Sequence, residues 1–263
     1  MATPQTGISI GKTEKYLQDK LLSEGVCYFI LIDPEKPGDV STLSRVASEE
    51  GATAIMIGGT TAQMASDYEA VISEVKRNGK LPVLIFPSNT ASVARGADAI
   101  WFMSLLNSDD PYYIIGAQML GIPGIKKFHL EPIPLAYIIV GYGGTVGYVG
   151  RARPIPYERQ EIGAAYAMAA EALGMRFVYF EGGSGAPTHI PPEFIAYSRR
   201  FVKSTIMVGG GITNGKIAES LVEAGADAIV TGNVLEGEAE MRAKIKEILA
   251  GCKEGVERRR AKA

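Results

Sequence analysis

The stretch FVYFEGGSGAP, residues 177–187, joins an apolar run to a glycine-rich segment. Its first four residues are apolar, aromatic or β-branched, and such a short run between turn residues predicts a buried strand. Glu181 follows directly, and then glycines surround Ser184. Glycine lets the backbone adopt positive φ and lets backbone amides approach an anion closely. The stretch therefore predicts a strand that ends in an anion-binding loop, with a flexible turn as the alternative interpretation.

Outward from this stretch, short apolar runs alternate with longer helical patterns along the chain. Predicted strands cover residues 26–32, 54–57, 83–86, 99–103, 137–140, 177–180, 206–208 and 228–230. Predicted helices cover residues 12–23, 38–50, 65–78, 157–173, 215–224 and 236–249. Several strands are apolar on both faces, as parallel strands beneath helices must be.

This repeat over 263 residues predicts an α/β fold, a (β/α)8 TIM barrel formed as one domain over residues 1–263, with an additional N-terminal helix. An open doubly wound sheet is the alternative fold. The segments 105–127 and 141–156 are too long for tight connections, and we interpret them as functional loops. The basic tail, about residues 253–263, is expected to be a solvated end that can lie near anionic lipid.

The composition excludes several classes of protein. Hydrophobic residues make up 46% and charged residues 21%, which is an ordinary globular balance. A net charge of −2 gives no basic footprint for nucleic acid, and two histidines argue against a histidine-rich metal site. Residues 1–12 lack the apolar centre of a signal peptide, and no apolar run approaches the roughly 20 residues that span a bilayer. With Cys27 inside an apolar run, a reducing cytoplasm is the expected compartment.

Two further predicted strands end in glycines. Gly209, Gly210 and Gly211 follow the run TIMV, and Thr231, Gly232 and Asn233 follow the run AIV. In barrels of this kind the loops after strands 7 and 8 commonly form a phosphate site. Backbone amides and a helix N-terminus supply its positive potential. We therefore predict phosphate binding at these two strand ends.

A near match to a nucleotide-binding loop overlaps the first of these segments. Gly210, Gly215 and Lys216 have the spacing of that motif, but Ile217 stands where a Ser or Thr should bind Mg²⁺. Lys216 is therefore interpreted as an exposed residue at the start of a helix.

The first two predicted strands end in oxygen-bearing side chains. Asp33 follows the first strand, and Thr60 follows the second after Gly58 and Gly59. In a barrel both side chains lie at the mouth, where active sites are found. A hard cation such as Mg²⁺ takes oxygen ligands and fills its other positions with water and substrate phosphates. We predict a Mg²⁺ site at Asp33 and Thr60, with an Asp-Pro turn at Asp33 as the structural alternative.

These motifs resemble those of the geranylgeranylglyceryl phosphate synthase family, the archaeal ether-lipid enzymes and their bacterial heptaprenyl relatives. The matching stretches lie between about residues 26 and 235: LIDPEK, IMIGGT, ADAIWFMSLLNS, HLEPIPLAYIIVG, YFEGGSGAP, VGGGI and VTGN. The form YFEGGSG, the long loops and the basic tail resemble the second subgroup of the family. Some members carry a Lys two residues before the first-strand Asp, whereas this chain has Leu31.

The resemblance implies alkylation of sn-glycerol 1-phosphate by geranylgeranyl diphosphate, which forms the first ether bond of archaeal membrane lipids and releases diphosphate. Mg²⁺ at Asp33 and Thr60 would neutralise the leaving diphosphate, and Glu181 would accept the proton of the attacking hydroxyl. The glycerol phosphate would bind to Tyr179, Phe180, Glu181, Gly182, Gly183, Ser184, Gly185, Gly210, Gly211, Gly232 and Asn233. A homo-oligomer, dimer or hexamer, is expected, with no nucleic acid and at most peripheral contact with a membrane.

The C20 chain needs an apolar groove, for which the candidates are Trp101, Phe102, Leu105, Leu106, Tyr137 and Ile139. Core packing explains each of these residues equally well. Two other functions stay open from the residues alone. One is a different phosphate-binding barrel enzyme, such as a sugar-phosphate isomerase or lyase, and the other is a barrel that binds a phosphometabolite without catalysis.

Overall fold

In this computed structural model, which describes residues 10–61, 64–232 and 237–262, eight parallel strands form a closed barrel in sequence order. The strands are β1 (Cys27–Ile32), β2 (Ala54–Ile57), β3 (Val83–Ile85), β4 (Ala99–Leu105), β5 (Glu131–Ile139), β6 (Phe177–Glu181), β7 (Thr205–Gly209) and β8 (Ala228–Gly232). Closure comes from β8, which pairs with β1 from Cys27 opposite Ala228 to Leu31 opposite Gly232. The predicted (β/α)8 barrel is therefore confirmed.

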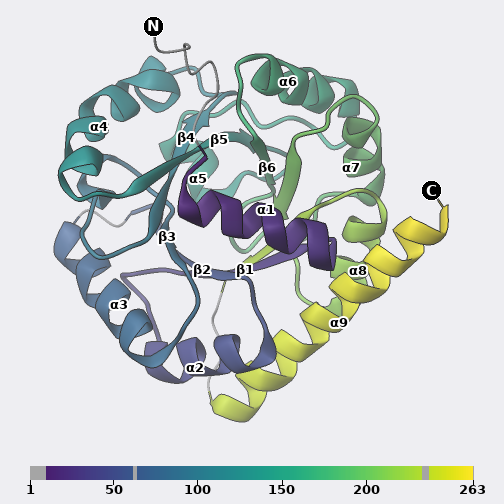
Figure 1. Cartoon of the computed structure of the whole chain (residues 1–263). Coiled ribbons are helices and arrows are strands. Elements are labelled where there is room, and N and C mark those ends of the chain that lie inside the picture. Colours follow the sequence, from purple (N-terminus) through teal and green to yellow (C-terminus); the bar gives the residue numbers. More distant parts are fainter. Residues whose placement is uncertain (1–9, 62–63, 233–236, 263) are drawn as a thin grey trace, which may run out of the picture.

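The helices surround this barrel (Figure 1). They are α1 (Lys12–Glu24), α2 (Val40–Glu50), α3 (Ala65–Asn78), α4 (Ala117–Lys127), α5 (Gly144–Val149), α6 (Gln160–Ala172), α7 (Pro192–Arg199), α8 (Gly215–Glu223) and α9 (Glu238–Lys262). A short 3₁₀ helix, η1 (Thr90–Ser92), and a π-helix, η2 (Tyr112–Gly116), complete the described elements. Asn214 caps α8 by accepting a hydrogen bond from the amide of Ile217 at 3.0 Å, as the sequence predicts.

The additional N-terminal helix α1 lies across one end of the barrel (Figure 1). Its Leu17 is fully buried among the side chains that fill the barrel. The carboxylate of Glu131, at the first position of β5, accepts hydrogen bonds from the amides of Thr13 at 2.6 Å and Glu14 at 2.9 Å. A carboxylate at this end satisfies orphan amides and complements the helix dipole. The site must therefore lie at the opposite end of the strands.

The interpretation of residues 105–127 and 141–156 as long loops is wrong, because both segments contain helix. The first holds η2 and α4, and the second holds α5. Pro123 lies inside α4, and Gly121 and Gly124 flank it. Glycine and proline disfavour helix in isolation, and the exposed side of α4 is apolar as well. No amphipathic period therefore marks this helix in the sequence.

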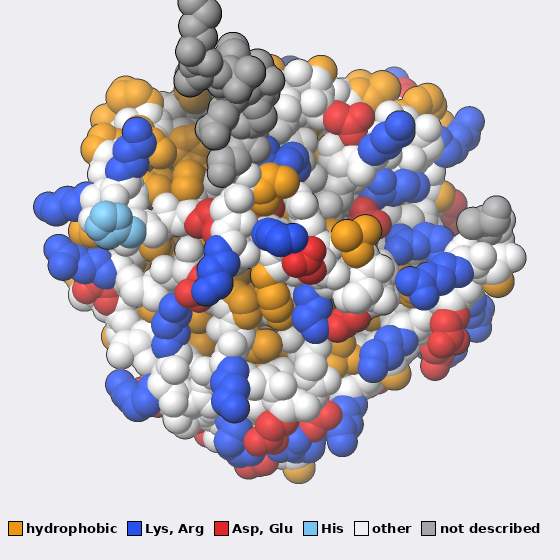
Figure 2. All heavy atoms as spheres, viewed as in Figure 1, with side chains coloured by type: hydrophobic (Ala, Val, Ile, Leu, Met, Phe, Trp, Pro, Cys, Tyr) orange, Lys and Arg blue, Asp and Glu red, His pale blue; other side chains and the backbone are white. Residues whose placement is uncertain are grey.

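The basic tail is not a loose solvated end. Residues 253–262 continue α9, and Cys252 and Val256 are buried against the barrel side. Arg259 donates to the carbonyl oxygens of Gly25 at 2.7 Å and Ala226 at 3.0 Å. Figure 2 shows that basic and acidic side chains are interspersed on this face of the molecule. Arg258 pairs with Glu219 at 2.8 Å and Arg259 with Asp227 at 3.3 Å, so the cations of the tail are partly neutralised.

Two hydrophobic layers hold the fold together. One fills the barrel and includes Phe29, Trp101, Tyr179 and Met207, and the other lies between the strands and the helices. Both cysteines are buried, and burial raises the pKa of the Cys27 thiol to about 12, as expected for a small hydrophobe rather than a reactive group. In the described part of the chain no helix is both long and apolar enough to cross a membrane.

Candidate active site

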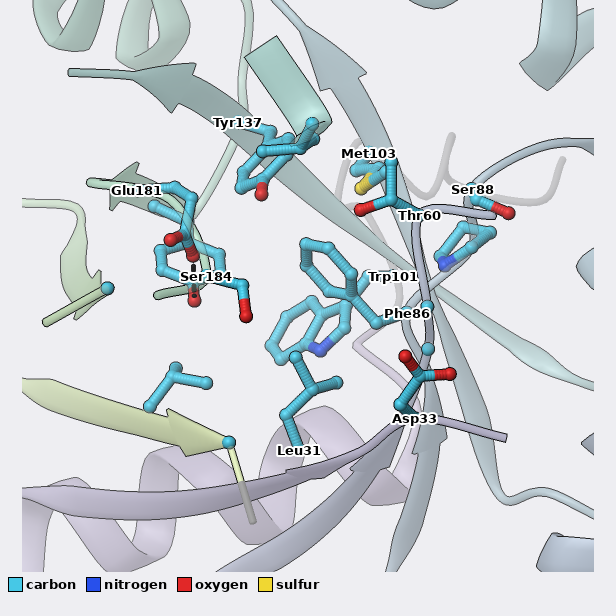
Figure 3. A pocket seen from close by; sticks show the side chains of 18 of the residues that line it. Leu31, Asp33, Thr60, Phe86, Ser88, Trp101, Met103, Tyr137, Glu181 and Ser184 are labelled. Atoms are coloured by element: carbon cyan, nitrogen blue, oxygen red, sulfur yellow. Dashed lines mark hydrogen bonds between the residues drawn. The ribbon is translucent and has the colours of Figure 1, made fainter. Parts of the chain in front are cut away.

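A cavity of about 790 Å³ opens among the loops that follow the strands. It joins two groups of predicted site residues that are far apart in the sequence. Asp33 and Thr60 line it after β1 and β2. On the other side it is lined by residues at the ends of β6 and β8 and in the loops after β6 and β7: Tyr179, Glu181, Ser184, Gly185, Gly210, Gly211 and Gly232. Figure 3 shows Asp33 and Thr60 on one side of this space and Glu181 and Ser184 on the other.

Three of the residues predicted to contact glycerol phosphate make contacts within the protein instead of lining the cavity. Phe180 faces away from the barrel interior, where its ring packs edge-on against Phe194 with centroids 5.4 Å apart. The amide of Gly182 donates to the carbonyl of Gly209 at 3.0 Å, and the amide of Gly183 donates to Oε1 of Glu181 at 2.6 Å. Both amides are bonded within the protein in this structure.

The prediction for Asn233 lies outside the described residues. Glycines open to the cavity are found at two other positions. A side-chain carbon built at Gly185 or Gly232 has no atom of the described chain within 4 Å. At these positions a ligand can approach the backbone without competition from atoms of the described residues.

The backbone around Gly210 is more crowded. Gly210 has φ 86° and Gly211 has φ 70°, values in the left-handed region that favours glycine. A side-chain carbon at Gly210 would lie 2.7 Å from both Oε1 of Glu181 and the amide nitrogen of Gly183. The glycines that follow β7 thus let the loop after β6 and the carboxylate of Glu181 come together.

Glu181 is 7% exposed and is held by two hydrogen bonds. The hydroxyl of Tyr179 donates to its Oε2 at 2.6 Å, and the amide of Gly183 donates to its Oε1 at 2.6 Å. Burial raises the pKa of Glu181, and the two hydrogen bonds oppose that shift. A carboxylate with a raised pKa inside a cavity is suited to accept a proton.

Asp33 forms the Asp-Pro turn and also lines the cavity. Its Oδ1 accepts a hydrogen bond from the amide of Glu35 at 2.9 Å, and its carbonyl accepts one from Lys36 at 3.1 Å. Within the described chain, Oδ2 has no protein donor. A side-chain carbon at Gly59 would lie 2.4 Å from Oδ1 of Asp33, so the turn that carries Thr60 abuts the carboxylate.

The carboxylate of Asp33 and the hydroxyl of Thr60 are oxygen donors of the kind that Mg²⁺ accepts. Mg²⁺ is usually held by one or two carboxylates together with substrate phosphates. Among the described residues no cluster of three or more His, Cys, Asp or Glu side chains is found, so an all-protein metal cage is not formed there. Asp33 and Thr60 instead supply a carboxylate and a hydroxyl beside open space.

Aromatic residues line the space between the two groups, and sequence reasoning missed one of them. Phe86 follows β3, and its ring lies 5.1 Å from that of Tyr137 and 5.7 Å from that of Tyr179, centroid to centroid. The sequence signal for Phe86 was its place at the end of an apolar strand, which core packing explains equally well.

The predicted groove residues divide between lining and core. Trp101, Phe102, Leu105 and Tyr137 line the cavity, whereas Ile139 is fully buried in the core and Leu106 packs in the outer layer. The helices missed in the sequence contribute Tyr113, Gln118 and Val146 to the same wall. Lys216 is exposed and pairs with Glu219 at 2.9 Å, as its interpretation as a helix residue requires.

A sequence model of the PcrB family matches residues 19–252. The chain belongs to the PcrB family. Within it, the geranylgeranylglyceryl phosphate synthase of Methanothermobacter marburgensis is 46% identical over 242 residues, which cover 91% of this chain and 98% of that protein. The enzyme of the same name from Pyrococcus horikoshii is 47% identical over 231 residues, 87% of this chain and 91% of that protein.

Solved structures of family members have the same barrel. The (S)-3-O-geranylgeranylglyceryl phosphate synthase of Thermoplasma acidophilum, in complex with sn-glycerol-1-phosphate, superposes with a TM-score of 0.86 at 34% identity and covers 94% of this chain and 100% of its own. The thiamine phosphate pyrophosphorylase of Pyrococcus furiosus, at 17% identity and a TM-score of 0.55 over 89% of this chain and 98% of its own, shares the fold alone. The resemblance predicted from the sequence motifs is therefore confirmed.

Proposed function

We propose that this protein transfers a geranylgeranyl group from its diphosphate to the hydroxyl of sn-glycerol 1-phosphate. The observation that carries the proposal is one shared cavity, which has Asp33 and Thr60 at one side, Glu181 and the glycine loops at the other, and an apolar wall between. Relatives that are 46% and 47% identical bear the name of this activity. The alternative barrel enzymes do not need a long apolar wall.

The glycerol phosphate binds beside Ser184, Gly185, Gly210, Gly211 and Gly232 in this proposal. The openness of Gly185 and Gly232 supports it, because backbone amides beside open space suit a phosphate. The other hydrogen-bond donors to the phosphate come from the loops after β6 and β7. This arrangement brings the glycerol hydroxyl near Glu181.

In the reaction, the glycerol oxygen forms a bond to the first carbon of the prenyl chain. The bond between that carbon and the diphosphate oxygen breaks, and diphosphate leaves with the electron pair. Glu181 takes the hydroxyl proton, a role to which its raised pKa is suited. Mg²⁺, held by Asp33 and Thr60, supplies charge neutralisation for the leaving diphosphate when it is bound.

The direct test incubates the protein with radiolabelled sn-glycerol 1-phosphate, geranylgeranyl diphosphate and Mg²⁺. A labelled product that extracts into organic solvent supports the proposal, and sn-glycerol 3-phosphate serves as the matched substrate control. Turnover across C15, C20, C25 and C35 diphosphates gives the accepted chain length. No product with any of these diphosphates would reject prenyl transfer and favour a phosphate-binding barrel of another kind.

We also propose that the protein acts as a homo-oligomer in the cytoplasm. Apolar side chains on α4 and α5 support association, since Met119 is 63% exposed, Leu120 57% and Tyr148 88%. The free, buried cysteines are in keeping with a reducing compartment. Light scattering after gel filtration measures the mass, and a monomer at micromolar concentration would reject the oligomer.

A further inference from the structure

Phe86 lies between the two sides of the cavity, with its backbone near the turn beside Asp33 and its ring near Tyr179, the partner of Glu181. At its backbone end, a side-chain carbon built at Gly58 would lie 2.2 Å from its carbonyl oxygen, and the next residue, Gly59, abuts the Asp33 carboxylate. At its ring end, Phe86 contacts Tyr179, whose hydroxyl donates to Glu181 at 2.6 Å. Figure 3 shows the ring extending into the middle of the space, between Asp33 and Glu181.

The ring of Phe86 is more open than those of Trp101, Tyr137 and Tyr179. Trp101 is 0% exposed, Tyr179 1% and Tyr137 3%, whereas Phe86 is only half-buried. Both tyrosine rings stand nearly perpendicular to that of Phe86, at 81° for Tyr137 and 72° for Tyr179. This edge-on packing holds the Phe86 ring in place while part of it still borders the cavity.

We infer that the ring of Phe86 stabilises positive charge on the prenyl carbon during transfer, an inference that rests on the proposed function. The carbon that changes partners must lie between the diphosphate near Asp33 and the glycerol hydroxyl near Glu181. As the carbon–oxygen bond breaks, the electron pair leaves with diphosphate and the allylic carbons become positive. The negative face of an aromatic ring attracts a cation within about 6 Å of its centroid.

A purely apolar wall makes a different prediction. If Phe86 only shapes the groove for the prenyl chain, then its size and hydrophobicity matter and its electron density does not. Fluorine atoms on the ring withdraw electrons and weaken the attraction for a cation, while they keep the shape and slightly raise hydrophobicity. The two roles can therefore be separated without removing the side chain.

The experiment replaces Phe86 with phenylalanines that carry one, two and three ring fluorines. Single-turnover rate constants are measured with saturating geranylgeranyl diphosphate, sn-glycerol 1-phosphate and Mg²⁺. The same analogues at Phe194, which lies on α7 and is fully buried against Phe180 of β6, serve as the matched control. Melting temperature and calorimetric binding of glycerol phosphate monitor the fold and the other substrate.

We expect the rate constant to fall with each fluorine at Phe86, by about 2- to 30-fold with three fluorines. The same analogues at Phe194 should leave the rate constant unchanged. F86L should fall at least as far as the trifluorinated variant while it still binds glycerol phosphate. If the parent protein is active and fluorination leaves the rate unchanged or raises it, the inferred role of Phe86 is overturned and the proposed function is not. If the parent forms no product, the proposed function and this inference are both overturned.

Discussion

Gly210 and Gly232 lie at the ends of neighbouring strands, yet an added methyl group meets different surroundings at each. At Gly232 no atom of the described chain lies within 4 Å, so Gly232→Ala should leave the melting temperature unchanged and obstruct only a ligand. We expect its KM for glycerol phosphate to rise more than its KM for the prenyl diphosphate. Equal changes in both KM values would show that the phosphate does not bind at Gly232.

Gly210→Ala is the informative comparison. Its φ of 86° and the 2.7 Å approach to Glu181 both oppose a side chain. We expect a lower melting temperature and a loss of kcat as well as a higher KM, because the Glu181 carboxylate must move. A stable, fully active Gly210→Ala protein would contradict the described loop geometry.

Asp33 tests the proposed magnesium site. Asp33→Asn should leave the fold intact, because the amide oxygen can still accept the hydrogen bond from Glu35. Activity should fall strongly, since a neutral amide is a much weaker Mg²⁺ ligand than a carboxylate. Initial rates over a Mg²⁺ titration measure the effect. Near-normal turnover at low Mg²⁺ would make Asp33 a turn residue only.

Glu181→Gln removes the proposed proton acceptor and keeps the shape of the side chain. Accepting a proton during attack is worth roughly 10²- to 10⁴-fold in rate, so kcat should fall within that range. Glycerol phosphate affinity should change little in calorimetric titration. If binding is lost while the residual single-turnover chemistry stays fast, Glu181 positions the substrate and another group accepts the proton.

At the scale of elements, the packing of α8 against α9 depends on glycine. A side-chain carbon at Gly251 would lie 1.9 Å from the carbonyl oxygen of Gly215, and one at Gly255 would lie 2.6 Å from that of Glu219. The backbones of the two helices therefore approach closely, side by side in Figure 1. This contact anchors the part of α9 that the sequence suggested was a free tail.

Gly251→Ala should consequently destabilise the protein, although alanine is intrinsically the better helix former by about 1 kcal/mol. Overpacking of this kind costs about 1–3 kcal/mol. The matched control is Gly121→Ala in α4, where the nearest atom, Cγ2 of Val93, lies at an ordinary 3.6 Å. Chemical denaturation should show a loss of stability for Gly251→Ala and none for Gly121→Ala. Equal denaturation midpoints for Gly251→Ala and Gly121→Ala would contradict the close contact between α8 and α9.

For the whole molecule, the buried carboxylate of Glu181 links stability to pH. Burial raises the pKa of Glu181 in the folded protein above its ordinary value of 4.5, so the folded state binds the proton more tightly than the unfolded state. The stability contributed by the bound proton is present below the unfolded pKa and is lost as pH rises through the folded pKa. Melting temperatures of the parent protein should therefore decline relative to Glu181→Gln across this window. Parallel pH profiles for the two proteins would contradict the raised pKa.

Local sequence patterns predicted all eight strands, although β5 begins at Glu131, before the predicted run 137–140. They also predicted the Asn214 cap and the residues at the strand ends. Apolar runs and turn glycines act between near neighbours, so they can be read locally, and barrel topology then brings Asp33, Glu181 and Gly232 to one mouth. Features that depend on contacts between distant residues could not be predicted from local patterns. Alternation along β6 implies that Tyr179 and Phe180 face opposite ways, but barrel closure determines which ring points inward. Likewise α4 is helical despite Gly121 and Pro123, because its packing beside the cavity outweighs weak local preference.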